Sequence, residues 1–270
     1  MPVAITTAWL GVAIVTGTIA ATLVGVVLVR RFVPRGRIAE NHEVAAVMFS
    51  MVGVLYAILL AFVVVVVWEE FGAADRSVND EVTKISNLMR DANAFDPARR
   101  SEIQTRLIDY ARSVVNDEWK TMAHGERSPE AAEKYRRIWS AYYGYTPRTE
   151  IQHSFYDESI NKLNELGAAR RLRLLASESS VPRILWMLLI AGAIITLGFV
   201  YLFEMPGRFV QPLVAGALAG LTGFILFLVL ALDHPFAGQV KIAPTAFVQV
   251  VDGYEHGDYC AAAVRTSCTR

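Results

Sequence analysis

The sequence predicts an all-α membrane protein with four transmembrane helices in a 2 + 2 arrangement and a helical bundle inserted between the second and third helices. The main observation is two pairs of long apolar stretches, at residues 10–29, 44–67, 184–203 and 209–232. Each has about 20 residues or more, enough for a helix to cross about 30 Å of hydrocarbon. The second observation is the polar, charge-dense segment between the pairs.

We therefore expect four parts along the chain. They are a first transmembrane helix pair at 1–67, an extramembrane helical insert at 68–183, a second transmembrane pair at 184–232 and a C-terminal tail at 233–270.

The composition agrees with a membrane location. The hydrophobic fraction is 54% and the mean hydropathy is +0.35. Lys plus Arg and Asp plus Glu are both 26, so the formal net charge is zero. This balance provides no electrostatic footprint for nucleic acid. We expect the lipid bilayer, and not a nucleic acid, as the principal partner.

The charges around the first pair bear on orientation. The flank 1–9 has no Lys or Arg, so the first stretch is expected to be a permanent anchor and not a cleavable signal. The loop 30–43 contains Arg30, Arg31, Arg35 and Arg37, which by the positive-inside rule places the loop in the cytoplasm and the insert outside. A second arginine cluster opposes this orientation because it precedes the third stretch: Arg170, Arg171, Arg173 and Arg183.

The second stretch is expected to continue into water as one helix ending near Asp91. Phe71, Val78 and Ile85 recur every seven residues beyond Trp68, with Val82 and Met89 on the adjoining stripe. The rest of the insert shows three helix start signals, at Asp96-Pro97, Ser128-Pro129 and Thr146-Pro147. Gly125 and Gly144 are expected to end the first two of these helices, and Pro182 marks entry into the third membrane stretch. An antiparallel bundle follows from this pattern.

The aromatic residues of the insert have two interpretations. They could form a ligand cage, but their helical spacing favours packing between helices. They are Trp119, Tyr135, Trp139, Tyr142, Tyr143 and Tyr145.

Small residues recur in the fourth stretch. Gly216 and Gly220 are four residues apart, with Gly223 on the adjoining turn. Glycines at this period allow close approach between transmembrane helices. We expect these three positions to face another helix, and Phe224 and Phe227 to face lipid or a neighbouring subunit.

Ionisable residues gather where two of the stretches end. Glu69 and Glu70 follow the second stretch, and Asp233 and His234 follow the fourth. If the two helices are neighbours, these groups could hold a cation or form a selectivity ring. The alternative is that they only mark the water boundary. The identity of any metal stays open.

Other polar motifs indicate local structure. Asn41, His42 and Glu43 would cap the second stretch, and Glu204 and Arg208 would pair across their turn. Cys260 and Cys268 lie in the tail, as free thiols or as a disulfide on an oxidising side.

No catalytic residues or cofactor are predicted. GxSxG, P-loop, HExxH and Gly-rich fingerprints are missing from the sequence. The four stretches contain no Asp, Glu, Lys or Arg, which argues against a proton-coupled transporter but leaves a channel open.

Several segments together resemble the bacterial bestrophin-like domain family of membrane proteins. The resemblance covers about residues 5–252 and is carried by segments at 30–34 (RRFVP), 41–45 (NHEVA), 56–62 (YAILLAF), 68–69 (WE) and 233–236 (DHPF). It implies four spans split by a helical region, as in bestrophins, which are pentameric anion channels. It also implies residence as a multi-pass protein in the bacterial inner (plasma) membrane.

Two functions follow as hypotheses. The first is a homo-oligomeric, bestrophin-like ion channel or pore that conducts small ions, with anions as the expected cargo. The alternative is a non-conducting membrane scaffold or sensor whose helical insert binds a partner or ligand. An enzyme ranks third because no nucleophile–base pair or metal set is visible.

Overall fold

The computed structural model describes residues 2–32, 42–203, 209–238 and 240–259. The described chain forms helices and turns, and it divides into two compact units. The first unit takes in residues 1–70, 180–234 and 238–240, and the second takes in 71–179, 235–237 and 241–270. Four described helices are long and apolar enough to cross a membrane. The prediction of an all-α protein with four transmembrane helices is therefore confirmed.

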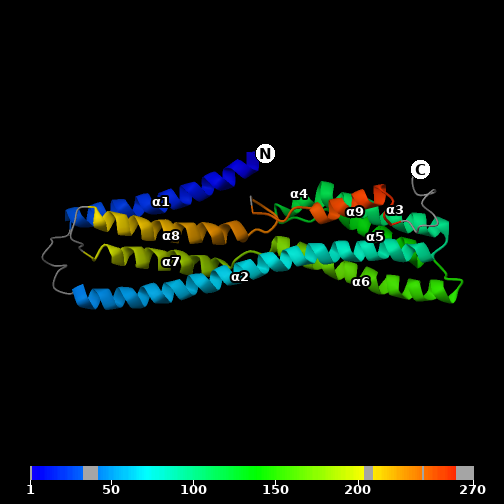
Figure 1. The fold of residues 1–270 in the computed structure, drawn as a ribbon, viewed down its shortest axis with the longest axis horizontal. Helices are drawn as coiled ribbons and strands as arrows, with labels where there is room; N and C mark the ends of the chain where they lie inside the picture. The colour runs from blue at the N-terminus through cyan, green and yellow to red at the C-terminus, as the bar shows by residue number, and fades with distance from the viewer. Residues whose placement is uncertain (1, 33–41, 204–208, 239, 260–270) are drawn as a thin grey trace. The chain divides into compact units, whose positions relative to one another are not determined.

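The first unit consists of α1 (Pro2–Phe32), the first part of α2 (His42–Asp91), α7 (Arg183–Val200) and α8 (Val210–Leu232). Helix α1 runs along α8, and α7 runs along α2 (Figure 1). Polar side chains join the helices near one end of the unit. The Arg30 guanidinium donates to Oε1 of Gln211 at 2.6 and 3.0 Å, and the Gln211 amide donates to the Val200 carbonyl.

The second unit is a helical bundle. It contains the remainder of α2, η3 (Ala92–Ala94), α3 (Pro97–Ser113), the π-helical turn η4 (Val114–Glu118), α4 (Trp119–Met122), α5 (Pro129–Tyr143), α6 (Glu150–Glu178) and α9 (Thr245–Glu255). Helix α2 is continuous to Asp91, as its apolar period predicts. Val78, Ile85 and Met89 from that period are fully enclosed in the core of this unit.

Two of the three predicted helix starts in the insert are confirmed. The Asp96 carboxylate accepts from the Arg99 N–H at 3.1 Å and caps α3. The Ser128 hydroxyl accepts from the Ala131 N–H at 3.2 Å and caps α5. Gly125 follows the end of α4 with a φ of +72°, a conformation that glycine adopts without a steric penalty.

The third start, at Thr146-Pro147, is wrong. Helix α6 begins at Glu150, and the Thr149 hydroxyl accepts from the Gln152 N–H at 3.2 Å. The Gln152 side chain in turn accepts from the Arg148 N–H at 2.9 Å. Thr149 and Gln152 thus have the spacing of a capping box, and their side chains satisfy two backbone donors.

Helix α9 was not anticipated from the sequence, which indicated only a tail there. Its Phe247 and Val250 are buried in the core of the second unit. The Trp119 ring lies edge-on to Phe236 and Phe247, with centroids 5.5 and 5.9 Å away. Its indole N–H donates to the Ile242 carbonyl at 3.2 Å. Aromatic packing thus includes Phe236 and Phe247 in the bundle.

The other aromatics of the insert also pack against one another. Phe95 lies edge-on to Tyr142 and Tyr145, and Tyr110 lies 5.8 Å from Tyr135. Tyr143 differs because it stacks on Trp139 yet remains 76% exposed. The packing interpretation therefore accounts for this group better than a ligand cage.

Candidate functional site

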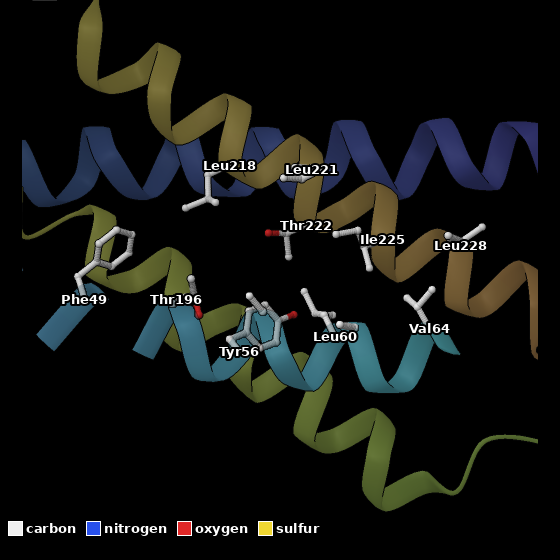
Figure 2. Close-up of a pocket in the computed structure, with 13 residues that line it drawn as sticks. Phe49, Tyr56, Leu60, Val64, Thr196, Leu218, Leu221, Thr222, Ile225 and Leu228 are labelled. Carbon is white, nitrogen blue, oxygen red and sulfur yellow. The ribbon is translucent and has the colours of Figure 1, made fainter. Parts of the chain in front are cut away.

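The first unit contains a cavity of about 430 Å³ lined by α2, α7 and α8 (Figure 2). Such a volume falls within the range of small-molecule sites. Its wall is mainly hydrocarbon, and the lining residues are Phe49, Gly53, Tyr56, Ala57, Leu60, Ala61, Val64, Thr196, Leu218, Leu221, Thr222, Ile225 and Leu228. Ala57, Ala61 and Leu221 also keep exposed surface, so the cavity opens to the surroundings of the unit.

Three hydroxyl groups interrupt this apolar wall. The Tyr56 hydroxyl is occupied because it donates to the Leu189 carbonyl at 3.1 Å, which ties α2 to α7. The Thr222 hydroxyl points into the space between α8 and α2 (Figure 2). The Thr196 oxygen is buried, and it has no hydrogen-bond partner among the described residues. An unpaired buried hydroxyl costs about 1–3 kcal/mol, so Thr196 marks a place where a ligand acceptor would be stabilised.

The cavity is long along the helix axis. Its α2 lining runs from Phe49 to Val64, a separation of 15 residues, which corresponds to about 22 Å. The Phe49 end lies beside the end of α7, since the Phe49 and Phe199 rings are 6.3 Å apart. Figure 2 shows the lining side chains following α2 and α8 in a row and not around a sphere.

The candidate ion-site residues occupy different environments. Glu69 and Glu70 are exposed on α2. Asp233 is buried, and its carboxylate accepts from the Val181 N–H at 2.6 Å. His234 is exposed, with Nδ1 3.6 Å from the other Asp233 oxygen.

Within the part of the chain that the structure describes, no three His, Cys, Asp or Glu residues form a group that could hold a metal ion. Asp233 instead joins the start of α7 to the end of α8 through the Val181 N–H.

The glycines of α8 lie against α1. A Cβ atom at Gly223 would lie 3.1 Å from Thr18 Oγ1 and 3.2 Å from the Val15 Cα, which is closer than ordinary van der Waals contact. At Gly220 the nearest atom would be Ile19 Cδ1 at 3.3 Å, and at Gly216 it would be Ile19 Cγ2 at 3.9 Å. Among these three glycines, Gly223 therefore approaches α1 most closely.

The two phenylalanines of α8 differ from each other. Phe224 is exposed, but Phe227 lies against Gly11 of α1, where a Cβ atom would be 2.8 Å from its ring. Phe227 thus contributes to packing within the chain.

The second unit contains a buried ionic cluster that the sequence analysis missed. The Arg173 guanidinium donates to Glu81 at 2.7 Å and to Glu118 at 2.6 Å, and all three side chains are fully buried. Arg170 donates to the other Glu118 oxygen at 2.6 Å. The Tyr110 hydroxyl bonds to Glu81. Two carboxylates and two guanidiniums balance the formal charge of the cluster.

The surroundings of Arg173 are aromatic. Its guanidinium lies over the rings of Trp119 and Phe247, 5.8 and 5.6 Å from their centroids. Burial, followed by the negative charge of Glu81, raises the pKa of Tyr110 well above its ordinary value. The tyrosine therefore remains a neutral donor to Glu81.

The sequence contained a signal for this cluster. Glu81 lies three residues after Val78 and four before Ile85, on the apolar stripe of α2. A charge on a buried stripe requires a partner, because an unpaired buried charge is costly. The identity of the partners Glu118 and Arg173, which lie 37 and 92 residues away along the chain, required the tertiary structure.

Several motifs from the sequence lie outside the residues whose side chains are described. They are the cap at Asn41, His42 and Glu43, the loop arginines Arg35 and Arg37, the pair Glu204 and Arg208, and the cysteines Cys260 and Cys268.

Comparison with known proteins identifies the family. A model of the bestrophin-like domain matches residues 16–247, which is most of the chain. This protein belongs to the bestrophin-like domain family. Two solved structures of a bacterial bestrophin homologue from Klebsiella pneumoniae, each with a different single substitution, share the fold of the bestrophin-like chain. One has a TM-score of 0.64 at 13% identity and covers 88% of this chain and 96% of the homologue. The other has a TM-score of 0.63 at 14% identity and covers 88% and 97%. No curated protein matches the chain.

The bestrophin-like fold places the described features in a membrane protein. The cavity lies among helices that can span a bilayer, whereas the ionic cluster belongs to the second unit. The family assignment agrees with the resemblance found in the sequence.

Proposed function

We propose that this bestrophin-like protein is a homo-oligomeric channel of the bacterial inner membrane that conducts small anions. The observation that carries the proposal is the two-sided character of α2 in the first unit. One stripe of α2, formed by Tyr56, Leu60, Val63 and Val67, is buried within the unit. The opposite stripe is exposed among the described residues and is formed by Met51, Leu55, Ile58, Phe62 and Val65.

The exposed stripe suits the wall of a pore. It contains no charged side chain, and a hydrophobic constriction can gate a pore by excluding water. Several copies of the chain around one axis would place equivalent stripes opposite one another. Phe62 is the largest side chain of the stripe and would define its narrowest ring. Glu69 and Glu70 lie beyond the last residue of the stripe, where carboxylates of several copies would form rings that favour cations. The choice of anions therefore comes from the family resemblance and not from these residues.

The test is conductance of purified protein in planar bilayers under a chloride gradient. We expect discrete openings with a reversal potential near that of chloride, and a larger unitary conductance for Phe62→Ala. Val27→Ala is the matched control, because Val27 is an exposed apolar residue of α1 and not of the proposed stripe. Silent bilayers with folded, oligomeric protein would contradict channel activity. A reversal potential that shows cation selectivity, with the selectivity lost in Glu69→Gln and Glu70→Gln, would show that the channel conducts cations and not anions.

A second candidate function is a scaffold or sensor whose insert binds a ligand. It is supported by a polar cavity of about 390 Å³ in the second unit, whose lining includes Asp96, Arg99, Thr146 and Arg148. Arg99 is already committed to the Ala141 carbonyl and Glu102, at 2.7 and 2.9 Å. A partner or metabolite retained by wild type and lost with Arg148→Ala, in protein that remains electrically silent, would favour this function.

A further inference from the structure

We propose that the cavity between α2, α7 and α8 holds one acyl chain of a bilayer glycerolipid, with the Thr196 hydroxyl donating to the ester carbonyl of that chain. This inference concerns a binding site and does not depend on conduction. It rests on the shape of the cavity, the chemistry of its wall and the depth of Thr196.

The shape of the cavity fits a linear chain. The cavity of about 430 Å³ follows a stretch of α2 that is about 22 Å long, so it is elongated. An elongated apolar cavity suits a linear hydrocarbon chain. The row of side chains along α2 and α8 in Figure 2 shows the same elongated form.

The wall chemistry excludes water as a stable occupant. A buried water makes about three hydrogen bonds, and most of the wall offers none. If the cavity were empty, the side chains that line it would lose dispersion contacts on the side that faces the cavity. The helices around the cavity are apolar enough to lie in hydrocarbon, and the cavity opens through Ala57, Ala61 and Leu221. Acyl chains are therefore the occupant at highest local concentration.

The depth of Thr196 fits an ester group. Helix α7 has 18 residues and is about 27 Å long, slightly less than the hydrocarbon thickness of about 30 Å. Its last residue, Val200, therefore lies close to the boundary where the esters of glycerolipids are found. Thr196 is about one turn further in, at the Phe49 end of the cavity. A carbonyl there would accept from the unpaired hydroxyl, and the chain would run toward Val64.

The first experiment fills the cavity. A Cβ atom at Gly53 would meet no atom within 4 Å, so Gly53→Leu extends a side chain into the cavity without a clash at its base. Gly17→Leu is the matched control, because Gly17 is equally free of neighbours but lies on α1, outside the cavity wall. Replacing Gly by Leu raises the intrinsic helix propensity equally at the two positions. A difference in folding between the two variants is therefore not expected to obscure the result.

The measurement uses vesicles of phosphatidylethanolamine and phosphatidylglycerol that contain a phospholipid with a photoreactive diazirine in its acyl chain. Crosslinks are mapped by mass spectrometry and normalised to those on the exposed face of α1. We expect enrichment on 57–61 and 221–228 in wild type and Gly17→Leu, with a several-fold loss in Gly53→Leu. Labelling in wild type equal to that of α1, or unchanged in Gly53→Leu, would overturn the proposal. Crosslinks from these segments to a second copy of the chain in place of lipid would overturn it too.

The second experiment tests the hydrogen bond. Thr196→Val preserves the shape of the side chain and removes its donor. After exchange into detergent, native mass spectrometry counts the phospholipids that each chain retains. We expect wild type to keep one tightly held lipid and Thr196→Val to lose it at several-fold lower detergent exposure. Equal lipid retention by both proteins would show that the Thr196 hydroxyl does not bind the lipid ester, and it would overturn that part of the proposal.

Discussion

Arg173 on α6 and Glu81 on α2 form an ion pair from which water is excluded, with Nε 2.7 Å from the carboxylate and neither side chain exposed. The pair is part of a larger set, because Arg173 also donates to Glu118 and to the Met122 sulfur, and Tyr110 donates to Glu81. Removing one member leaves the others buried without compensation, so the cluster should be sensitive to single substitutions.

Arg173→Met should destabilise the second unit by about 3–5 kcal/mol, because it leaves Glu81 and Glu118 buried beside each other without their main cation. The measurement is the melting temperature of the purified protein. Arg136→Met is the control, since Arg136 pairs with Glu133 in solvent and should leave the melting temperature unchanged. Equal melting of wild type and Arg173→Met would show that the cluster does not contribute to stability.

Tyr110→Phe tests the hydrogen bond to Glu81. At neutral pH we expect a loss of about 1.5–3 kcal/mol, the value typical of a bond to a charged group. The pKa of Tyr110 is raised in the folded state, so its stabilising effect is present below the ordinary tyrosine pKa of about 10 and declines as pH rises above it. Denaturation from pH 8 upward should therefore show a shallower alkaline loss in Tyr110→Phe. Parallel pH profiles would contradict this role.

The contact between α8 and α1 predicts a graded response at the three glycines. Gly223→Leu and Gly220→Leu should lower the stability of the folded protein by about 1–3 kcal/mol or more, because the larger side chains overpack the contact with α1. Gly216→Ala should cost much less, because its Cβ would meet Ile19 only at ordinary contact distance. Melting temperature and oligomer yield in detergent measure the effect. A uniform response at all three positions would show that the close approach at Gly223 is unimportant.

The start of α6 can be tested by two threonine substitutions. Thr149→Ala removes the cap of α6 and should cost about 1 kcal/mol. Thr146→Ala, at the position that the sequence favoured, should have no measurable effect. Thermal melting compares the two variants. A larger loss of thermal stability for Thr146→Ala would indicate that α6 begins at Thr146-Pro147.

The elements that could be predicted from the sequence are those set by local chemistry. The four membrane helices follow from uninterrupted apolar runs, since a charge-free run of that length is stable only in hydrocarbon. Asp96 and Ser128 could be recognised as caps because a short polar side chain before a proline has few other roles. Thr149 was missed because the proline at 147 gave a stronger signal than the capping box two residues later.

Only the tertiary structure decided which distant residues meet. Glu81 lies on the apolar stripe of α2, but its partners Glu118 and Arg173 lie far from it in the sequence, and their charges fit a solvated helix face until the bundle encloses them. The cavity beside Thr196 is likewise a property of three helices together, since each of its walls is an ordinary apolar helix alone. Local sequence determines whether a segment becomes a helix, but burial is a collective quantity, and the partners of a buried polar group depend on how all the helices pack.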